Sequence, residues 1–192
     1  MTDHSPTPPA TPSTAAYFDT GPLSWVIGEI REALERSRVA LIDAGEREGD
    51  ARLTSLQHAR THLHQAHGAL QMVDVEGVAL LTAAAESAIE RMRDGALAVD
   101  GAGFAGAAAA ISDAYQAITE YLDELMGGAA PQPARLFPYH RALQQALGAE
   151  RIHPSDLLFV DLSVQVPLAS ATAAAAPDYK ACRSAFELGS AV

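Results

Sequence analysis

Four histidines, at positions 58, 62, 64 and 67, fall within a single short stretch of the chain. Counted at helical spacing, one face of this stretch is apolar and the neighbouring face is polar. The apolar positions are Leu56, Leu63, Ala66 and Leu70, and the polar positions are Gln57, Arg60, His64, His67 and Gln71. His64 therefore lies at the edge of a buried face, and a neutral imidazole nitrogen is a competent nucleophile near neutral pH. A rigid helix would fix its direction, which suits a phosphoryl acceptor.

Gly68 follows His64 by about one helical turn. Glycine inside a helix costs about 1 kcal/mol relative to alanine, so its presence suggests a reason. One such reason is close approach of a partner, because glycine has no side chain to hold another protein away. We therefore predict His64 as the catalytic residue, with Gln57, Arg60, His67, Gly68 and Gln71 as the residues that dock a partner.

The order of His64, His67 and Gly68 resembles the His-x-x-Lys-Gly signature of histidine phosphotransfer (Hpt) domains, and residues 72–86 resemble the turn and next helix of that family. A longer resemblance, over roughly residues 17–165, is to the amino-terminal region of ChpA/PilL-type hybrid kinases. Those are chemosensory histidine kinases that control type IV pili and twitching motility. The segments that carry it, in order, are 18–26, 61–71 and 155–162.

This resemblance implies that His64 accepts a phosphoryl group within a phosphorelay and passes it to an aspartate on a response-regulator receiver domain. The partners would be that receiver and a cognate histidine kinase, in the cytoplasm. The receiver would supply magnesium and an acidic pocket, so no cofactor is expected here. Similar kinases are longer, which implies that this chain is a fragment. His67 stands where most Hpt domains have lysine, and we expect docking or phosphate stabilisation that is weaker or dependent on pH.

Two alternatives stay open. FimL-like relatives keep the fold, lack the phosphorylatable histidine and serve in scaffolding, so the chain could be a non-catalytic pseudo-Hpt binding module of the same system. It could also be a structural helical domain that spaces other modules. A solvent-open His64 would favour phosphotransfer, whereas a buried His64 would favour binding or structural roles.

Composition and motifs argue against several other functions. The net charge of -11 and the lack of a basic patch argue against nucleic acid as a partner. No apolar run is long enough for a membrane span, and a single cysteine, Cys182, allows no internal disulfide. No phosphate-binding loop or ATP-binding segment is present, so the chain should not phosphorylate itself. His58 and His62 have zinc-ligand spacing but no local third ligand, so no metal site is expected.

The hydrophobic pattern, rich in alanine and poor in aromatics, predicts an all-α fold, an antiparallel bundle of four or five helices. The first helix should open near Pro22 with Asp19 or Thr20 as its cap, and Asp50 and Asp74 should cap the second and third. A fourth helix is predicted at 102–126 and a short fifth at 135–147. The buried stripe of the first helix should comprise Leu23, Val26, Ile27, Ile30, Leu34, Leu41 and Ile42, with Trp25 and Tyr17 as packing residues.

The domain organisation follows from these elements and from changes in composition. Residues 1–16 are rich in proline, threonine and serine and are predicted to be a disordered leader. Residues 17–128 should form the Hpt-like bundle. Residues 135–166 should add a carboxy-terminal helix and a short extended segment near 157–166, both packed on the bundle. Residues 167–192 are predicted to be a linker and the start of a truncated further helix.

Overall fold

The computed structural model describes residues 18–96 and 101–159. Over these residues the chain is helical and contains no strand, so the prediction of an all-α fold is confirmed. The elements in chain order are α1 (Thr20–Glu46), α2 (Gly49–Met72), α3 (Val78–Arg93), α4 (Gly101–Met126), the 3₁₀ helix η1 (Pro133–Leu136), α5 (Phe137–Ala146) and the 3₁₀ helix η2 (Pro154–Leu157).

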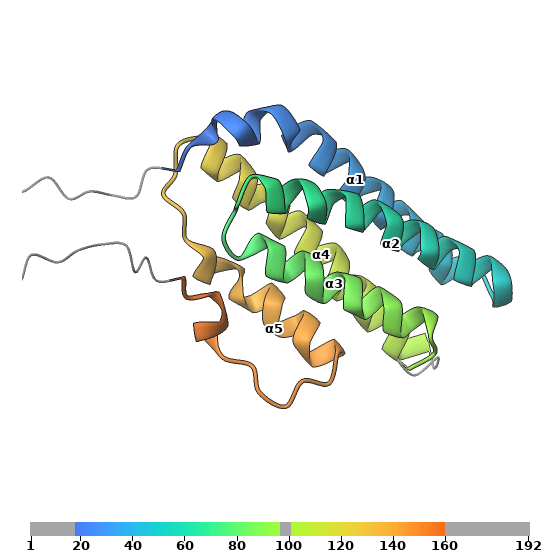
Figure 1. Cartoon of the computed structure of the whole chain (residues 1–192). Helices are drawn as coiled ribbons and strands as arrows, with labels where there is room; N and C mark the ends of the chain where they lie inside the picture. Colours follow the sequence, from blue (N-terminus) through green and yellow to red (C-terminus); the bar gives the residue numbers. More distant parts are fainter. Residues whose placement is uncertain (1–17, 97–100, 160–192) are drawn as a thin grey trace, which may run out of the picture. The chain divides into compact units, whose positions relative to one another are not determined.

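The long helices pack side by side around one apolar core (Figure 1). Helix α1 packs against α2 and α4, α2 also packs against α3, and α5 lies against α3 and α4. Because only two residues join α1 to α2, these helices run antiparallel as a long hairpin (Figure 1). The largest fully buried side chains are Leu23, Ile30, Leu41, Leu56, Leu63, Leu70, Leu81, Ile89, Ile111, Ile118, Leu122 and Leu125.

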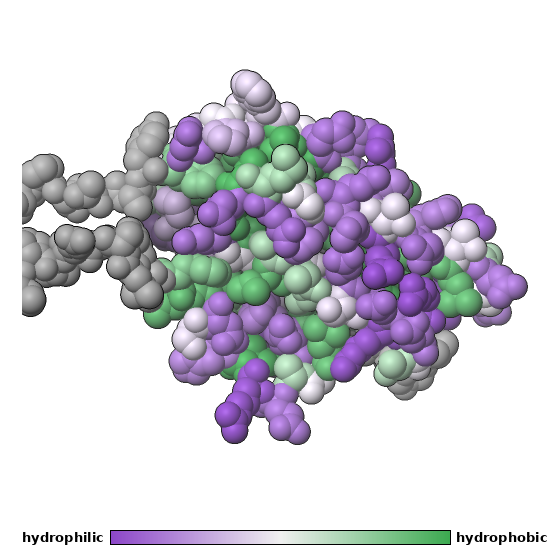
Figure 2. All heavy atoms as spheres, in the orientation of Figure 1, coloured by the Kyte–Doolittle hydropathy of each residue, from purple (hydrophilic) through white to green (hydrophobic). Residues whose placement is uncertain are grey.

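The surface of these helices is mixed in character. Figure 2 shows hydrophilic side chains over much of the face seen in Figure 1, with smaller hydrophobic patches between them. Within residues 18–96 and 101–159, no helix combines the length and the apolar character needed to cross a membrane.

Helix α1 begins as predicted but buries a narrower stripe than expected. Asp19 is the N-cap, and its side chain accepts a hydrogen bond from the backbone N–H of Gly21 at 2.9 Å. The prediction that Trp25 packs in the structure is wrong, because its side chain is 90% exposed. Ile42 is also 50% exposed. Both lie next to the buried positions of the helix rather than on them, since each residue turns the helix by about 100°.

The predicted caps of α2 and α3 are both wrong. Glu48 occupies the N-cap position of α2 without a side-chain hydrogen bond, and Asp50 lies in the first turn. Helix α3 begins later than expected, after Gly77, and Asp74 instead adopts a left-handed turn with φ of 49°. Gly77 has φ of 82°, and a Cβ there would lie 2.8 Å from Cβ of Pro133. The close approach of η1 therefore requires glycine at this turn.

The carboxy-terminal part of the described chain agrees with prediction in its helix and differs after it. Helix α5 falls within the predicted range of 135–147, and η1 directly precedes it. The first residue of the predicted extended segment near 157–166, Leu157, is instead the buried last residue of η2, and Leu158 after it is extended and exposed. The rest of that segment, the predicted leader with Tyr17, and residues 167–192 lie outside the described residues.

A buried pair of hydroxyl groups joins three helices. Ser37 on α1 lies 2.8 Å from the backbone oxygen of Ala59 on α2 and 2.8 Å from the hydroxyl of Tyr115 on α4. Because serine has one hydroxyl proton and donates it to Ala59, Tyr115 donates its own proton to Ser37. Burial raises the pKa of Tyr115 well above its ordinary value, so the phenol stays protonated and able to donate.

This arrangement predicts different costs for two small deletions. Tyr115→Phe should lower the free energy of unfolding by about 1 kcal/mol, because Ser37 keeps its bond to Ala59. Ser37→Ala should cost more, up to about 3 kcal/mol, because it strands a buried phenol hydroxyl. Denaturant unfolding of the two variants and the parent measures both values. A larger loss in Tyr115→Phe than in Ser37→Ala would contradict this account.

His140 on α5 is buried, with 4% of its surface exposed. Burial lowers its pKa from the ordinary value of 6.5, although the nearby Asp156 carboxylate acts in the opposite direction. The folded protein therefore resists protonation of this ring more than the unfolded chain does. Its contribution to stability is complete above pH 6.5 and is lost as the pH falls from 6.5 through the folded pKa.

We expect His140→Gln to reduce the pH dependence of unfolding in this window. The parent should lose stability as the pH is lowered below 6.5, and the variant should lose less, because glutamine does not titrate. Thermal unfolding measured across the window tests this expectation. Parallel stability curves for parent and variant would show that His140 does not set the dependence.

Candidate functional site

The buried face of α2 determines where its histidines point. Leu56, Leu63, Ala66 and Leu70 are all 0% exposed, which confirms the apolar stripe predicted from the sequence. Because α2 presents this stripe to the core, the neighbouring stripe lies along its border with α3. His64 is on that border, and 73% of its side chain is exposed to solvent.

His64 is held by a carboxylate from α3. Its Nδ1 lies 3.0 Å from Oε1 of Glu86, whose side chain is 18% exposed. An ionised carboxylate can only accept hydrogen bonds, so Nδ1 carries the proton that His64 donates to Glu86. In the neutral ring, Nε2 then holds the lone pair. The site thus combines an oriented imidazole with an unprotonated nitrogen on an exposed side chain.

Arg60 lies one turn before His64 and between two carboxylates of α3. Its Nε is 3.9 Å from Oε1 of Glu86, and its Nη2 is 3.8 Å from Oε1 of Glu90. Arg93 extends the row, with Nη2 3.5 Å from Glu90 and Nη1 donating to Oε1 of Gln57 at 3.3 Å. The predicted docking residues Gln57 and Arg60 therefore belong to a ladder of polar contacts between α2 and α3.

His67 is held by a hydroxyl rather than a carboxylate. Its Nδ1 lies 2.7 Å from Oγ1 of Thr82, and the ring is half-buried. The Thr82 hydroxyl is also placed to donate to the backbone oxygens of Ala79 at 3.0 Å and Val78 at 3.2 Å. When Thr82 donates to either oxygen, its own oxygen accepts a hydrogen bond from Nδ1 of His67. His67 therefore lacks the anionic partner that His64 has.

Gly68 leaves the backbone of α2 open at the site. A Cβ built at this position would meet no atom within 4 Å. Gln71 is exposed, and Met72, one turn after Gly68, is 83% exposed. Among the described residues, no side chain therefore lies close enough to obstruct a Cβ at position 68.

The open surroundings of Gly68 predict the effect of replacing it. Gly68→Ala should raise the free energy of unfolding by up to about 1 kcal/mol, because alanine favours the helix and meets no clash. Chemical denaturation measures the gain, and Gly106→Ala on α4 is a matched control, since a Cβ there also meets nothing within 4 Å. Destabilisation by Gly68→Ala alone would show that glycine is needed within the folded chain itself.

The sequence predicted the residues of α2 at the site but missed their partners on α3. Glu86 and Thr82 were not identified as site residues, although each bonds to one of the two histidines. The available signal was the spacing of Thr82, Glu86 and Glu90, which recur every four residues on an otherwise alanine-rich helix. That spacing becomes informative only when the register between α2 and α3 is known.

Other clusters of polar side chains are less suited to catalysis or metal binding. His58 and His62 line a shallow groove between α1 and α2 with Asp43 and Ser55. In the part of the chain that the structure describes, no group of three or more His, Cys, Asp or Glu side chains could hold a metal ion.

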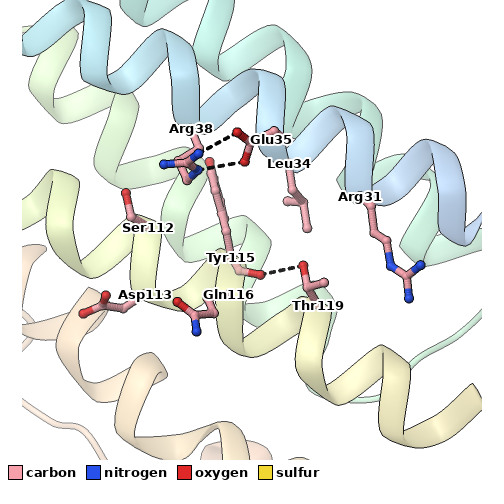
Figure 3. Close-up of a pocket in the computed structure, with 9 residues that line it drawn as sticks. All are labelled: Arg31, Leu34, Glu35, Arg38, Ser112, Asp113, Tyr115, Gln116 and Thr119. Atoms are coloured by element: carbon pink, nitrogen blue, oxygen red, sulfur yellow. Dashed lines mark hydrogen bonds and ion pairs between the residues drawn. The ribbon is translucent and has the colours of Figure 1, made fainter. Parts of the chain in front are cut away.

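A larger hollow of about 490 Å³ lies between α1 and α4 (Figure 3). Its two arginines already have carboxylate partners, since Arg38 binds Glu35 and Arg31 binds Asp123. The Glu35–Arg38 bond also lowers the pKa of Glu35. Ser112, at the rim of the hollow, donates its hydroxyl to the backbone oxygen of Ala108 on its own helix. The hollow therefore offers no activated nucleophile comparable to His64.

We compared the chain with protein-family models, with curated proteins and with solved structures, and none of the three comparisons gave a match.

Proposed function

We propose that this chain is a histidine phosphotransfer domain in which Nε2 of His64 accepts a phosphoryl group. The observation that carries the proposal is the hydrogen bond from Nδ1 of His64 to Glu86, made by a side chain that is 73% exposed. The bond fixes the proton on one nitrogen and leaves the other as a nucleophile. Exposure lets a partner bring a phosphorylated group to it.

The transfer step needs little from this chain beyond position and charge. Nε2 of His64 donates its lone pair to phosphorus, and the N–P bond forms as the P–O bond of an aspartyl phosphate breaks. The electron pair of that bond leaves with the aspartate carboxylate. Positive charge develops on the imidazole as the new bond forms, and the Glu86 carboxylate 3.0 Å from Nδ1 stabilises it. The reverse reaction returns the phosphoryl group to a receiver.

The partner in this proposal is a response-regulator receiver domain that docks around Gly68. The open backbone there permits close approach, and Gln71 lies exposed beside it. A cognate histidine kinase supplies the phosphoryl group at the start of the relay. The resemblance in sequence supports an Hpt-like bundle and a role in the cytoplasmic chemosensory control of type IV pili. These finer assignments are part of the proposal.

A small-molecule donor tests the proposal without knowledge of the partner. Phosphoramidate should transfer one phosphoryl group to the chain, giving an acid-labile product detected by mass spectrometry. His64→Gln should abolish the product and leave the fold intact, because the ring is exposed. His62→Gln is the matched control, since His62 lies on the same helix and contacts only Gln65 among the described hydrogen bonds.

The labelling pattern decides between the functions considered from sequence. Labelling of the parent and of His62→Gln, but not of His64→Gln, supports phosphotransfer. Equal labelling of His64→Gln and the parent would remove His64 from the proposed role. A folded parent that accepts no phosphoryl group from phosphoramidate or from a panel of phosphorylated receivers would leave a recognition module as the better description.

A further inference from the structure

Two large apolar side chains lie almost fully in water at one end of the α1–α2 hairpin. Trp25 is 90% exposed and Met72 is 83% exposed, the highest values among the large apolar side chains that the structure describes. A single exposed apolar residue needs no explanation, but tryptophan and methionine are enriched where proteins bind one another. Whether these two side chains form one patch depends on their positions along and around the helices.

The two side chains lie at the same level of the hairpin. Trp25 is 21 residues before the end of α1, and Met72 is 23 residues after the start of α2. At 1.5 Å per residue, these positions are about 32 and about 35 Å from the turn that joins the helices. Figure 1 shows the start of α1 and the end of α2 at the same end of the bundle.

Helical spacing turns both side chains toward the outer groove between α1 and α2. Further along, that groove is lined by Arg36 of α1 and His58 of α2, among others. Trp25 precedes Arg36 by 11 residues, which is within about 20° of three whole turns. Met72 follows His58 by 14 residues, within about 40° of four whole turns. Trp25 and Met72 therefore lie along the same groove, one on each side, and we call them the end patch.

The end patch lies within reach of a protein that docks over His64. His64 is about 23 Å from the same turn, so it is about 9 Å from Trp25 along the helix axes. The axes of packed helices are about 8–10 Å apart. A standard interface buries about 800 Å² on each partner, the area of a disc about 16 Å in radius. Gly68 lies between His64 and Met72 on α2, and its open backbone joins the two parts of this surface.

Charge favours a different protein over a second copy as the occupant of the end patch. The chain has a net charge of -11, so two copies repel each other. Glu29 is exposed one turn after Trp25 on the same face of α1. An apolar patch with an acidic residue at its rim is complementary to an apolar surface with basic residues around it.

We propose that Trp25 and Met72 are the apolar anchors of the surface that docks the receiver domain. This inference deepens the proposed function and rests on it for the identity of the partner. The receiver contributes an apolar site with basic residues at its rim, opposite Trp25 and Glu29. Trp25 is the stronger anchor, because truncation of a tryptophan in an interface costs more binding free energy than truncation of most side chains. Both anchors act on binding and not on the chemical step.

The fluorescence of Trp25, the only tryptophan of the chain, tests docking directly. The free full-length parent should show the red-shifted emission of tryptophan in water at every chain concentration. At least one of a panel of tryptophan-free receiver domains should shift that emission to the blue, and added salt should weaken the complex.

Three fluorescence results would overturn the inference. Blue-shifted emission from the free parent at every concentration would show that other residues of this chain cover Trp25. A blue shift that grows with the concentration of the chain itself would show that a second copy binds the end patch. The third is the absence of any shift with every receiver in the panel.

Transfer kinetics then separate docking from chemistry. With the tightest-binding receiver, phosphorylated beforehand, Trp25→Ala should raise KM by roughly 10- to 30-fold and leave kcat unchanged. Met72→Ala should raise KM by roughly fivefold. Labelling by free phosphoramidate needs no docked protein and should proceed at the parent's rate in both variants.

Ile42→Ala is the matched control for these variants. Ile42 is also apolar and 50% exposed on α1, but it lies near the opposite end of the helix and lines a hollow shared with α4. Its replacement should leave KM for the receiver unchanged. An unchanged KM in Trp25→Ala, or an equal rise in Ile42→Ala, would contradict the role given to the end patch.

The two proposals can fail separately. A receiver that binds through Trp25, with His64 labelled neither by that receiver nor by phosphoramidate, would retain the docking surface and remove the proposed phosphotransfer. Labelling of His64 by a receiver with the same KM in the parent and in Trp25→Ala would do the reverse.

Discussion

The hydrogen bond between Nδ1 of His64 and Glu86 is the interaction on which the rest of this account depends. It joins an exposed ring on α2 to a largely buried carboxylate on α3, across 3.0 Å. A free histidine on a helix surface samples several rotamers and both tautomers, which makes it a poorly directed nucleophile. The hydrogen bond to Glu86 restricts both the rotamer and the tautomer of His64. Helices α2 and α3 hold the two side chains opposite each other.

Both helices that carry this bond bury small residues in the core. Ala59 and Ala66 of α2 and Ala85 and Ala88 of α3 are all 0% exposed, which allows the helices to approach closely. Short polar bonds such as the one between His67 and Thr82, at 2.7 Å, require α2 and α3 to lie close together. The alanine-rich composition therefore matters for the polar bonds at the site as well as for the packing of the helices.

The sequence was most informative where a single helix contains the whole pattern. The buried stripe of α2 and the exposure of His64 follow from spacing along one element, and the cap at Asp19 follows from its position before the first turn. Trp25 was misplaced because a large aromatic was assumed to pack, whereas the stripe of α1 passes beside it. Asp50 and Asp74 were misplaced because Glu48 and Gly77 occupy the cap positions, and neither helix has a side-chain cap that a sequence pattern could reveal.

The partners of the histidines could not be predicted in the same way. Glu86 and Thr82 belong to a different helix, and their contact with α2 depends on a turn whose geometry includes positive φ at both Asp74 and Gly77. A shift of one residue in that turn would rotate α3 by about 100° and present a different face to the histidines. The residue pattern of a single helix gives no information about this rotation of α3.

The role of Glu86 in directing His64 can be read from the ring nitrogen that carries the phosphoryl group. ³¹P and ¹⁵N NMR of the labelled chain distinguish phosphate on Nε2 from phosphate on Nδ1. We expect a single product, with phosphorus on Nε2 of His64 and the proton retained on Nδ1, where it is donated to Glu86. Phosphate on Nδ1 of His64, or on another histidine while His64 stays unmodified, would contradict it.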